Sequence, residues 1–270
     1  MTEEADDATE RTGRDPAPAV TRSIRLLGLL AERRGSMTLT ELATGLGLAK
    51  SSTANLCLAL EAAEMVQRVP LGYQLGRRTA ELGGAFAAQF HQVREFYSVC
   101  EVSPVLRHEL VQVAMLDGRD ALYLARFEGS AVMRLGTPLG SRLPAALTAT
   151  GRALLMRLAD EQVTELLSDA VPFPAITHHS RTTLPELLEQ LDKARERGWT
   201  LDEEESYPGV VGVAVPLEGW APGDPALALG VGMPVAEATV ERIETVGTAL
   251  LSAAAALTNP FSEAARRKKS

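Results

Sequence analysis

The stretch from Leu39 to Leu56 constrains the fold of this chain more than any other part of its sequence. Its apolar positions recur at the spacing that buries one face of two helices crossing at a sharp angle: Leu42, Leu46, Leu48, Thr53 and Leu56. Ala43 is small where the helices would touch, and Gly47 lies where the turn needs a positive φ. Thr38 and Glu41 have the spacing of a capping box that begins the first helix. An ordinary αα-hairpin would share some of these features, but their coincidence favours a DNA-binding helix-turn-helix.

A helix is expected on each side of this turn, and another before them. The first, near 21–33, places Ile24, Leu27 and Leu30 on one face and ends at Gly35. The second covers about 40–46 and the third about 50–64. The third helix should bury Thr53, Leu56, Cys57, Leu60 and Ala63. It should turn outward Ser51, Ser52, Asn55, Leu58 and Ala59.

A short hairpin follows, because 65–69 and 73–75 alternate like strands and Pro70-Leu71-Gly72 makes the turn. A helix-turn-helix followed by a hairpin is a winged helix, which is expected over residues 20–76. Residues 19–78 hold eight bases and four acids, a local excess of +4 in a chain of net charge −8. Phosphate binding needs only such a local basic surface. The expected partner is double-stranded operator DNA, contacted by Arg22, Lys50, Ser51, Ser52, Asn55, Arg68 and Tyr73.

A connector helix is expected over residues 77–97. It is amphipathic and carries Leu82, Phe86, Phe90 and Val93 on one side. An apolar stripe on a connector favours packing against another subunit, so we expect a homodimer or a dimer of dimers.

The remainder, 98–258, is predicted to be a second domain of α+β type with a mainly antiparallel sheet. Residues 110–116 and 121–127 are alternating runs joined by an Asp-Gly turn, which indicates a hairpin. Further strands are expected at 131–135, 209–217 and 226–233. Helical periodicity covers 151–158, 161–167, 184–197 and 235–257.

The two ends differ in composition from the domains. Residues 1–19 are acidic and nearly free of large apolar side chains, so a disordered tail is expected. Residues 259–270 contain Arg266-Arg267-Lys268-Lys269 and are interpreted as a solvated basic tail. No secretory signal, no membrane span and no cysteine pair motif is found, so we expect a cytoplasmic protein that does not enter a membrane.

Several of these segments together resemble one family, the IclR-type transcriptional regulators. The first half carries Arg22-Ser23-Ile24-Arg25-Leu26-Leu27, Glu41-Leu42-Ala43, Lys50-Ser51-Ser52 and Tyr73-Gln74-Leu75-Gly76. The second half carries Leu147-Thr148-Ala149-Thr150-Gly151-Arg152-Ala153, Arg195-Glu196-Arg197-Gly198-Trp199 and Gly209-Val210-Val211-Gly212. The resemblance implies an α/β GAF-like sensor domain and a DNA-binding regulator controlled by a small molecule. The family's recognition helix usually has Arg where this chain has Asn55, which can read adenine.

By that resemblance the effector would contact Ala149, Thr150, Asp202, Gly212 and Gly230, and the loop that ends at Gly151 adds that residue to the expected site. The loop at 149–151 precedes a helix whose N–H groups can hold an anion, and the two glycines allow close approach to the backbone. Two positions that often bear Cys or Ser are glycines here. A carboxylate, or a larger and less polar metabolite, is therefore expected.

Other functions are weaker alternatives. A DNA-binding architectural factor without an effector would share the first domain, and an enzyme on a GAF-like scaffold would share the second. No catalytic motif is found, and no cofactor or metal is expected. His178-His179 is interpreted as loop surface. Glu203, Glu204 and Glu205 are interpreted as a solvated acidic turn, and Arg152 as facing solvent or a carboxylate.

Overall fold

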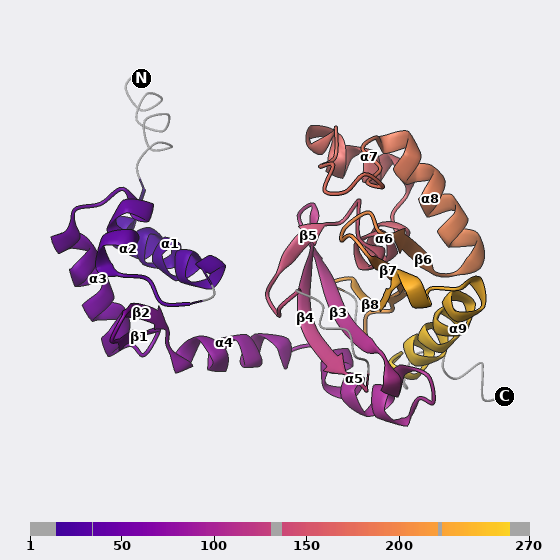
Figure 1. Cartoon of the computed structure of the whole chain (residues 1–270), viewed down its shortest axis with the longest axis horizontal. Helices are drawn as coiled ribbons and strands as arrows, with labels where there is room; N and C mark the ends of the chain where they lie inside the picture. Colours follow the sequence, from indigo (N-terminus) through magenta and orange to yellow (C-terminus); the bar gives the residue numbers. More distant parts are fainter. Residues whose placement is uncertain (1–14, 34, 131–136, 221–222, 260–270) are drawn as a thin grey trace, which may run out of the picture. The chain divides into compact units, whose positions relative to one another are not determined.

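The computed structural model describes residues 15–33, 35–130, 137–220 and 223–259, which fall into two compact units, Met1–Phe86 and Ala87–Ser270 (Figure 1). Of the disordered tail expected at 1–19, residues 1–14 lie outside the described residues, as does most of the basic tail, whereas Pro18 and Ala19 already belong to the first helix. The α+β class is confirmed: the first unit is mainly helical, and the second is built on an antiparallel sheet.

The first unit is a winged helix. It contains α1 (Pro18–Arg33), α2 (Leu39–Leu46), α3 (Lys50–Ala62), β1 (Val66–Val69), β2 (Gly72–Leu75) and α4 (Arg77–Ala87). The side chain of Thr38 accepts a hydrogen bond from the N–H of Glu41, and the Glu41 carboxylate accepts one from the N–H of Thr38, so the capping box is present. Gly47 ends α2 with a φ of 66°, the left-handed conformation that the turn requires.

The buried face of α1 differs from the expected one. Ile24 is 64% exposed, whereas Leu26 and Leu30 are buried against α2 and α3. The pair four residues apart therefore forms the inner face, and Ile24 is displaced from it. The helix also begins at Pro18, before the predicted start. On α3 the inner residues Thr53, Cys57 and Leu60 are as predicted, while Ala63 is exposed at the end of the helix.

The connector is not one helix. α4 ends at Ala87, and α5 (His91–Val102) begins after an extended residue, Phe90. The predicted apolar stripe is divided accordingly. Leu82 and Phe86 are 48% and 41% exposed on α4, whereas Phe90 and Val93 pack into the core of the second unit. Burial of Val93 in that core, with half-buried Phe90 packed against it, separates both residues from the α4 face, although no Gly or Pro marks the break.

The second unit is built on a six-stranded antiparallel sheet of order β5-β4-β3-β8-β7-β6. The predicted hairpin is formed by β3 (Leu110–Asp117) and β4 (Asp120–Glu128), with a bulge after Val113. β7 (Val210–Leu217) and β8 (Leu227–Pro234) are the two predicted apolar strands. The sequence analysis did not identify the edge strands β5 (Arg142–Pro144) and β6 (Thr200–Glu203). The strand expected at 131–135 lies outside the described residues.

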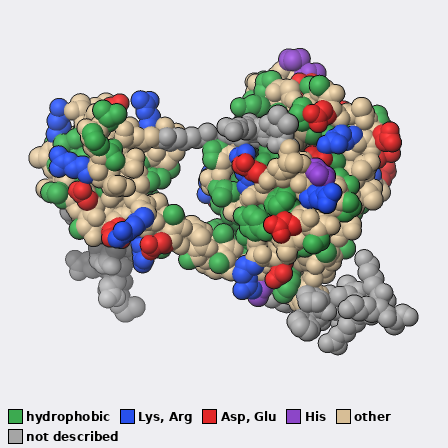
Figure 2. Space-filling model, turned by 60° about the horizontal axis from the view of Figure 1, so that its bottom comes forward, with side chains coloured by type: hydrophobic (Ala, Val, Ile, Leu, Met, Phe, Trp, Pro, Cys, Tyr) green, Lys and Arg blue, Asp and Glu red, His purple; other side chains and the backbone are tan. Residues whose placement is uncertain are grey.

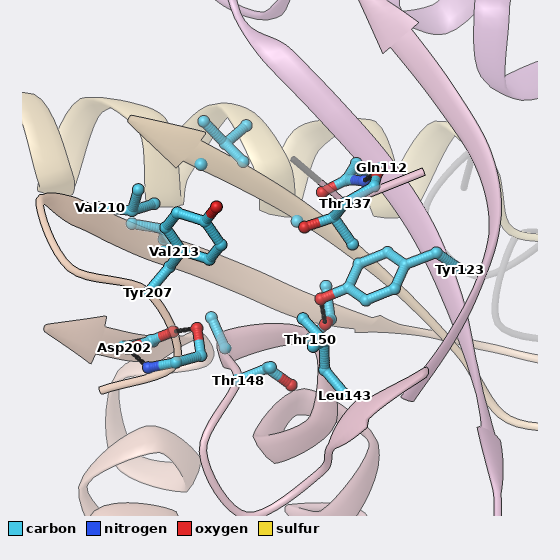
Figure 3. A pocket seen from close by; sticks show the side chains of 16 residues that line it. Gln112, Tyr123, Thr137, Leu143, Thr148, Thr150, Asp202, Tyr207, Val210 and Val213 are labelled. Carbon is cyan, nitrogen blue, oxygen red and sulfur yellow. Dashed lines mark hydrogen bonds between the residues drawn. The ribbon is translucent and has the colours of Figure 1, made fainter. Parts of the chain in front are cut away.

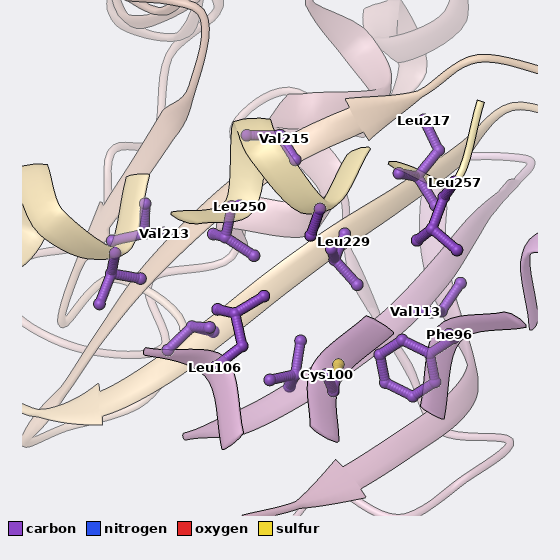
Figure 4. Packing of buried hydrophobic residues seen from close by; sticks show 14 of the residues in the cluster. Phe96, Cys100, Leu106, Val113, Val213, Val215, Leu217, Leu229, Leu250 and Leu257 are labelled. Carbon is purple, nitrogen blue, oxygen red and sulfur yellow. The ribbon is translucent and has the colours of Figure 1, made fainter. Parts of the chain in front are cut away.

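Helices cover both faces of this sheet (Figure 1). α5 and α9 (Val240–Ala256) pack on one face over the main hydrophobic core (Figure 4). α6 (Ala149–Leu155) packs on the other face, next to α7 (Asp160–Leu167) and α8 (Leu184–Arg197). α9 is shorter than predicted, because Val235–Glu237 is a separate 3₁₀ turn. Across the described part of the chain, no helix is both long and apolar enough to cross a membrane.

Candidate functional site

The amino-terminal half of α3 presents a polar surface. Lys50, Ser51, Ser52 and Asn55 are all exposed, as the sequence predicts. Thr53 fixes the opposite face: it is fully buried, and its hydroxyl donates to the carbonyl of Ala49 at 3.1 Å. The four exposed side chains are therefore held on one face of a helix whose other side is anchored in the core.

Basic side chains are exposed near this helix in the same unit. Figure 2 shows several Lys and Arg side chains on its surface. Arg22 on α1 and Arg68 on β1 are exposed, and the Arg68 guanidinium lies 6.0 Å from the centre of the Tyr73 ring. The expected DNA contact by Tyr73 does not agree with its burial. Tyr73 is 8% exposed and packs in the core of the unit. The buried Tyr73 ring lies beneath Arg68 and is not placed to contact DNA.

In the second unit, a cavity lies between the sheet and the start of α6 (Figure 3). Five of the six predicted effector residues line it: Ala149, Thr150, Asp202, Gly212 and Gly230. Gly151 does not, because it faces the chain at Ala145, where a Cβ on Gly151 would lie 2.3 Å from the Ala145 Cα. The cavity volume is about 50 Å³. That is room for roughly four water molecules.

Hydroxyl groups dominate the polar lining of this cavity. The hydroxyls of Tyr123 and Thr150 are 2.9 Å apart and hydrogen-bonded to each other. Thr148 caps α6, because its Oγ1 accepts the N–H of Gly151 at 3.0 Å. Gln112 lies on the side of the cavity away from Asp202, next to Thr137 (Figure 3). The cavity can thus donate and accept hydrogen bonds at several points.

Asp202 is the one carboxylate among the residues that line the cavity in the described structure. It is 3% exposed, and burial raises its pKa from 3.8 to about 6. Its Oδ1 accepts the N–H of Glu205 at 2.8 Å, and its Oδ2 accepts the hydroxyl of Ser206. These bonds, together with the charge of Arg152, oppose the increase in pKa. The group can therefore change protonation near neutral pH.

A buried ion pair holds the segment that carries Asp202. The guanidinium of Arg152 donates to both carboxylate oxygens of Glu205, and both side chains are 1% exposed. Arg152 also donates to the carbonyls of Ala146 at 2.9 Å and Leu201 at 2.8 Å. Arg181 forms a second ion pair with Glu205. The expectation of a solvated acidic turn is therefore wrong for Glu205, and Arg152 faces a carboxylate rather than solvent.

Sequence reasoning missed several lining residues: Gln112, Tyr123, Thr148, Ser206 and Tyr207. Tyr123 could have been found, because strand alternation from Ala121 places its side chain on the same face of β4. Ser206 and Tyr207 follow the acidic run in a loop and carry no such signal. Among the described side chains, no group of three or more His, Cys, Asp or Glu is placed to hold a metal ion.

The geometry defines a class of protein: a winged helix with an exposed polar recognition helix, and a separate sensor-like domain with a small polar cavity. The comparisons agree with it. Residues 19–70 match the model described as the IclR helix-turn-helix domain, and 98–259 match the bacterial transcriptional regulator IclR C-terminal domain. The chain belongs to the IclR family of DNA-binding transcriptional regulators.

Relatives with both domains support this membership. The chain is 31% identical to the transcriptional repressor IclR of Escherichia coli, over 92% of this chain and 95% of that protein. It is similar in structure to a putative transcriptional regulator from Rhodococcus, with a TM-score of 0.78 and 25% identity, over 89% and 96% of the two chains. An IclR homologue from Microbacterium hydrocarbonoxydans, solved with 4-hydroxybenzoate, has the same fold: TM-score 0.75, 22% identity, 88% and 97% coverage.

Removing the charge of Glu205 should destabilise the second unit. Glu205→Gln leaves the buried Arg152 with a neutral partner, which should lower the free energy of unfolding by about 3 kcal/mol. Urea unfolding followed by tryptophan fluorescence reports this unit, because Trp199 and Trp220 both lie in it. The control is Glu203→Gln, an exposed neighbour in the same acidic run. Equal, small losses in both variants would contradict the assigned role of the ion pair.

Asp202 should also leave a signature in the pH dependence of stability. Its folded-state pKa of about 6 exceeds the ordinary value of 3.8, so the folded chain binds the proton more tightly than the unfolded chain between these values. This contribution to stability is present at low pH and is lost as pH rises from about 4 to about 6. Asp202→Asn should reduce that decrease, whereas exposed Asp169→Asn should not. Unfolding measured at closely spaced pH values checks this, and identical wild-type and Asp202→Asn profiles would contradict it.

Proposed function

We propose that this IclR-family chain binds operator DNA through α3 and that a small molecule in the cavity of the second unit changes its affinity. One observation carries the DNA-binding part: Lys50, Ser51, Ser52 and Asn55 share the exposed face of α3. A recognition helix places such residues against base edges in the major groove, and phosphate contacts position it. We assign Ser51, Ser52 and Asn55 to bases, and Lys50, Arg22 and Arg68 to the DNA backbone. DNA binding also favours a cytoplasmic location.

The cavity supports a small, polar effector. Its volume of about 50 Å³ and its hydroxyl lining favour a short hydroxy- or oxo-acid over the larger, less polar metabolite that the sequence suggested. The homologue solved with 4-hydroxybenzoate has the same fold, and that ligand is an aromatic hydroxy-acid, larger than this cavity holds as it stands. Tyr207 lines the cavity and is 46% exposed, so its movement would make room for a longer ligand.

The cavity also separates this function from the alternatives. An architectural DNA-binding protein has no need of a polar cavity with a buried carboxylate, which favours a regulator that responds to a ligand. For an enzyme, the reacting groups would have to be available to a substrate. Here Asp202 accepts hydrogen bonds from its own loop, and Thr148 caps a helix. We therefore infer that the site binds a ligand without chemical change and without a cofactor.

Changing Asn55 should alter sequence recognition. Asn55→Ala should weaken specific operator binding by about 1–3 kcal/mol and relax the preference at one base position. Lys50→Ala is the matched comparison, because loss of a phosphate contact weakens binding to all sequences and reduces the salt slope by about one. Fluorescence anisotropy with the operator and with single-base variants, at several salt concentrations, measures both effects. Unchanged affinity and base preference in Asn55→Ala would refute this orientation of α3.

We propose that Leu82 and Phe86 on α4 are buried between two copies of the chain. Both are exposed in the single chain, and a two-fold dimer would present two α3 helices to an inverted repeat. The double variant Leu82→Glu and Phe86→Glu should give monomers with much weaker operator binding. Val235→Glu, at another exposed apolar residue, is the control. Analytical ultracentrifugation that finds the same oligomer in the variant and the wild type would count against this surface.

A further inference from the structure

If the ligand of the cavity is an acid, the lining residues provide no positive charge to bind it. None of the sixteen residues that line it in the described structure is Arg, Lys or His, and Asp202 is a carboxylate. An anionic ligand that is withdrawn from water in this cavity needs a positive partner or a set of directed N–H donors. Arg152 cannot supply the charge, because Glu205 and two backbone carbonyls already occupy its guanidinium.

Arg126 is placed to supply that charge. The register of β3 and β4 pairs Arg126 with Gln112, so the two side chains lie on the same face of the sheet. Gln112 lines the cavity. Both side chains donate towards one acceptor, the carbonyl of Thr137: Nε2 of Gln112 at 3.4 Å and Nη1 of Arg126 at 3.5 Å. Thr137 also lines the cavity, so a guanidinium that donates to its carbonyl lies at the edge of the cavity.

The ion pair between Arg126 and Glu128 is exposed to water on the side of the carboxylate. Nε of Arg126 lies 2.9 Å from Oε1 of Glu128, and the Arg126 side chain is 16% exposed whereas that of Glu128 is 67% exposed. An ion pair with so exposed a carboxylate contributes little free energy, because water competes for it. A ligand carboxylate at the edge of the cavity would offer the guanidinium a bidentate, less hydrated partner.

On the basis of the proposed function, we propose that Arg126 is the ligand-binding residue that selects an anionic effector, with Gln112 beside it. The acid group of the ligand binds at the Gln112 and Arg126 end, and a hydroxyl or other donor group points to Asp202 at the opposite end. The two ends of the cavity thereby bind a molecule that carries both an acid group and a hydrogen-bond donor. This arrangement also keeps the ligand's negative charge away from Asp202.

Matched pairs of acids and their neutral amides test the proposal on the full-length chain. The probes are pyruvate with pyruvamide and 4-hydroxybenzoate with 4-hydroxybenzamide, measured by thermal shift and by calorimetry. At least one acid should bind the wild type more tightly than its amide. Arg126→Gln should weaken binding of that acid by about 10- to 100-fold and leave the amide unchanged. Arg126→Lys should retain part of the preference for the acid.

The control is Arg142→Gln, on the neighbouring strand β5, which removes an exposed arginine paired with Asp117 and should not change the preference. The proposal is overturned if no acid binds better than its amide, or if Arg126→Gln weakens acid and amide equally, as a purely structural role would. Operator binding without any probe is measured in parallel. If the wild-type chain does not bind operator DNA, the regulator function itself is refuted. If it binds operator DNA but shows no preference for acids over amides, only the role of Arg126 is refuted.

Discussion

The ion pair between Arg152 and Glu205 is the interaction on which the second unit most depends. It joins α6 to the segment after β6, across 53 positions of sequence, with both side chains withdrawn from water. Burying two charges is costly unless their remaining hydrogen-bonding groups are also satisfied. Here two backbone carbonyls accept further N–H groups of the guanidinium, and Arg181 adds a second positive charge. The loop that presents Asp202 is held in place as a consequence.

Gly212 and Gly230 are explained better by the close packing of α6 on the sheet than by access of a ligand to the backbone. A Cβ on Gly230 would lie 2.6 Å from the Thr150 methyl, and one on Gly212 would lie 3.1 Å from the Cβ of Ala149. These residues therefore let the helix approach β7 and β8. A large side chain at Gly230 would displace α6 and disturb the fold. A substitution at this position would therefore not fill the cavity without other effects. The cavity is small because the same approach leaves little space.

The winged helix was predictable because its signals are local. A capping box, a glycine in the left-handed conformation and an alternating hairpin each act within a few residues, and the structure contains all three. The break before His91 has no such signal and arises from burial of Phe90 and Val93 in a core formed by distant segments. The partnership of Arg152 with Glu205 was equally invisible, since charge patterns along the chain do not reveal which pairs are buried together. Five of the six effector residues came from the family resemblance rather than from local physics.

β7 gives the cavity a physical connection to the start of α5. The strand begins at the cavity with Val210 and Gly212, and it ends at Leu217. The next residue, Glu218, accepts a hydrogen bond through its carbonyl from Nε2 of Gln92, which is 3% exposed on α5, at 2.6 Å. β7 is paired along both edges, with β8 and with β6, so this bond is anchored to a strand that is itself held on both sides. Gln92 therefore links the strand that lines the cavity to α5, the first helix after α4 in the chain.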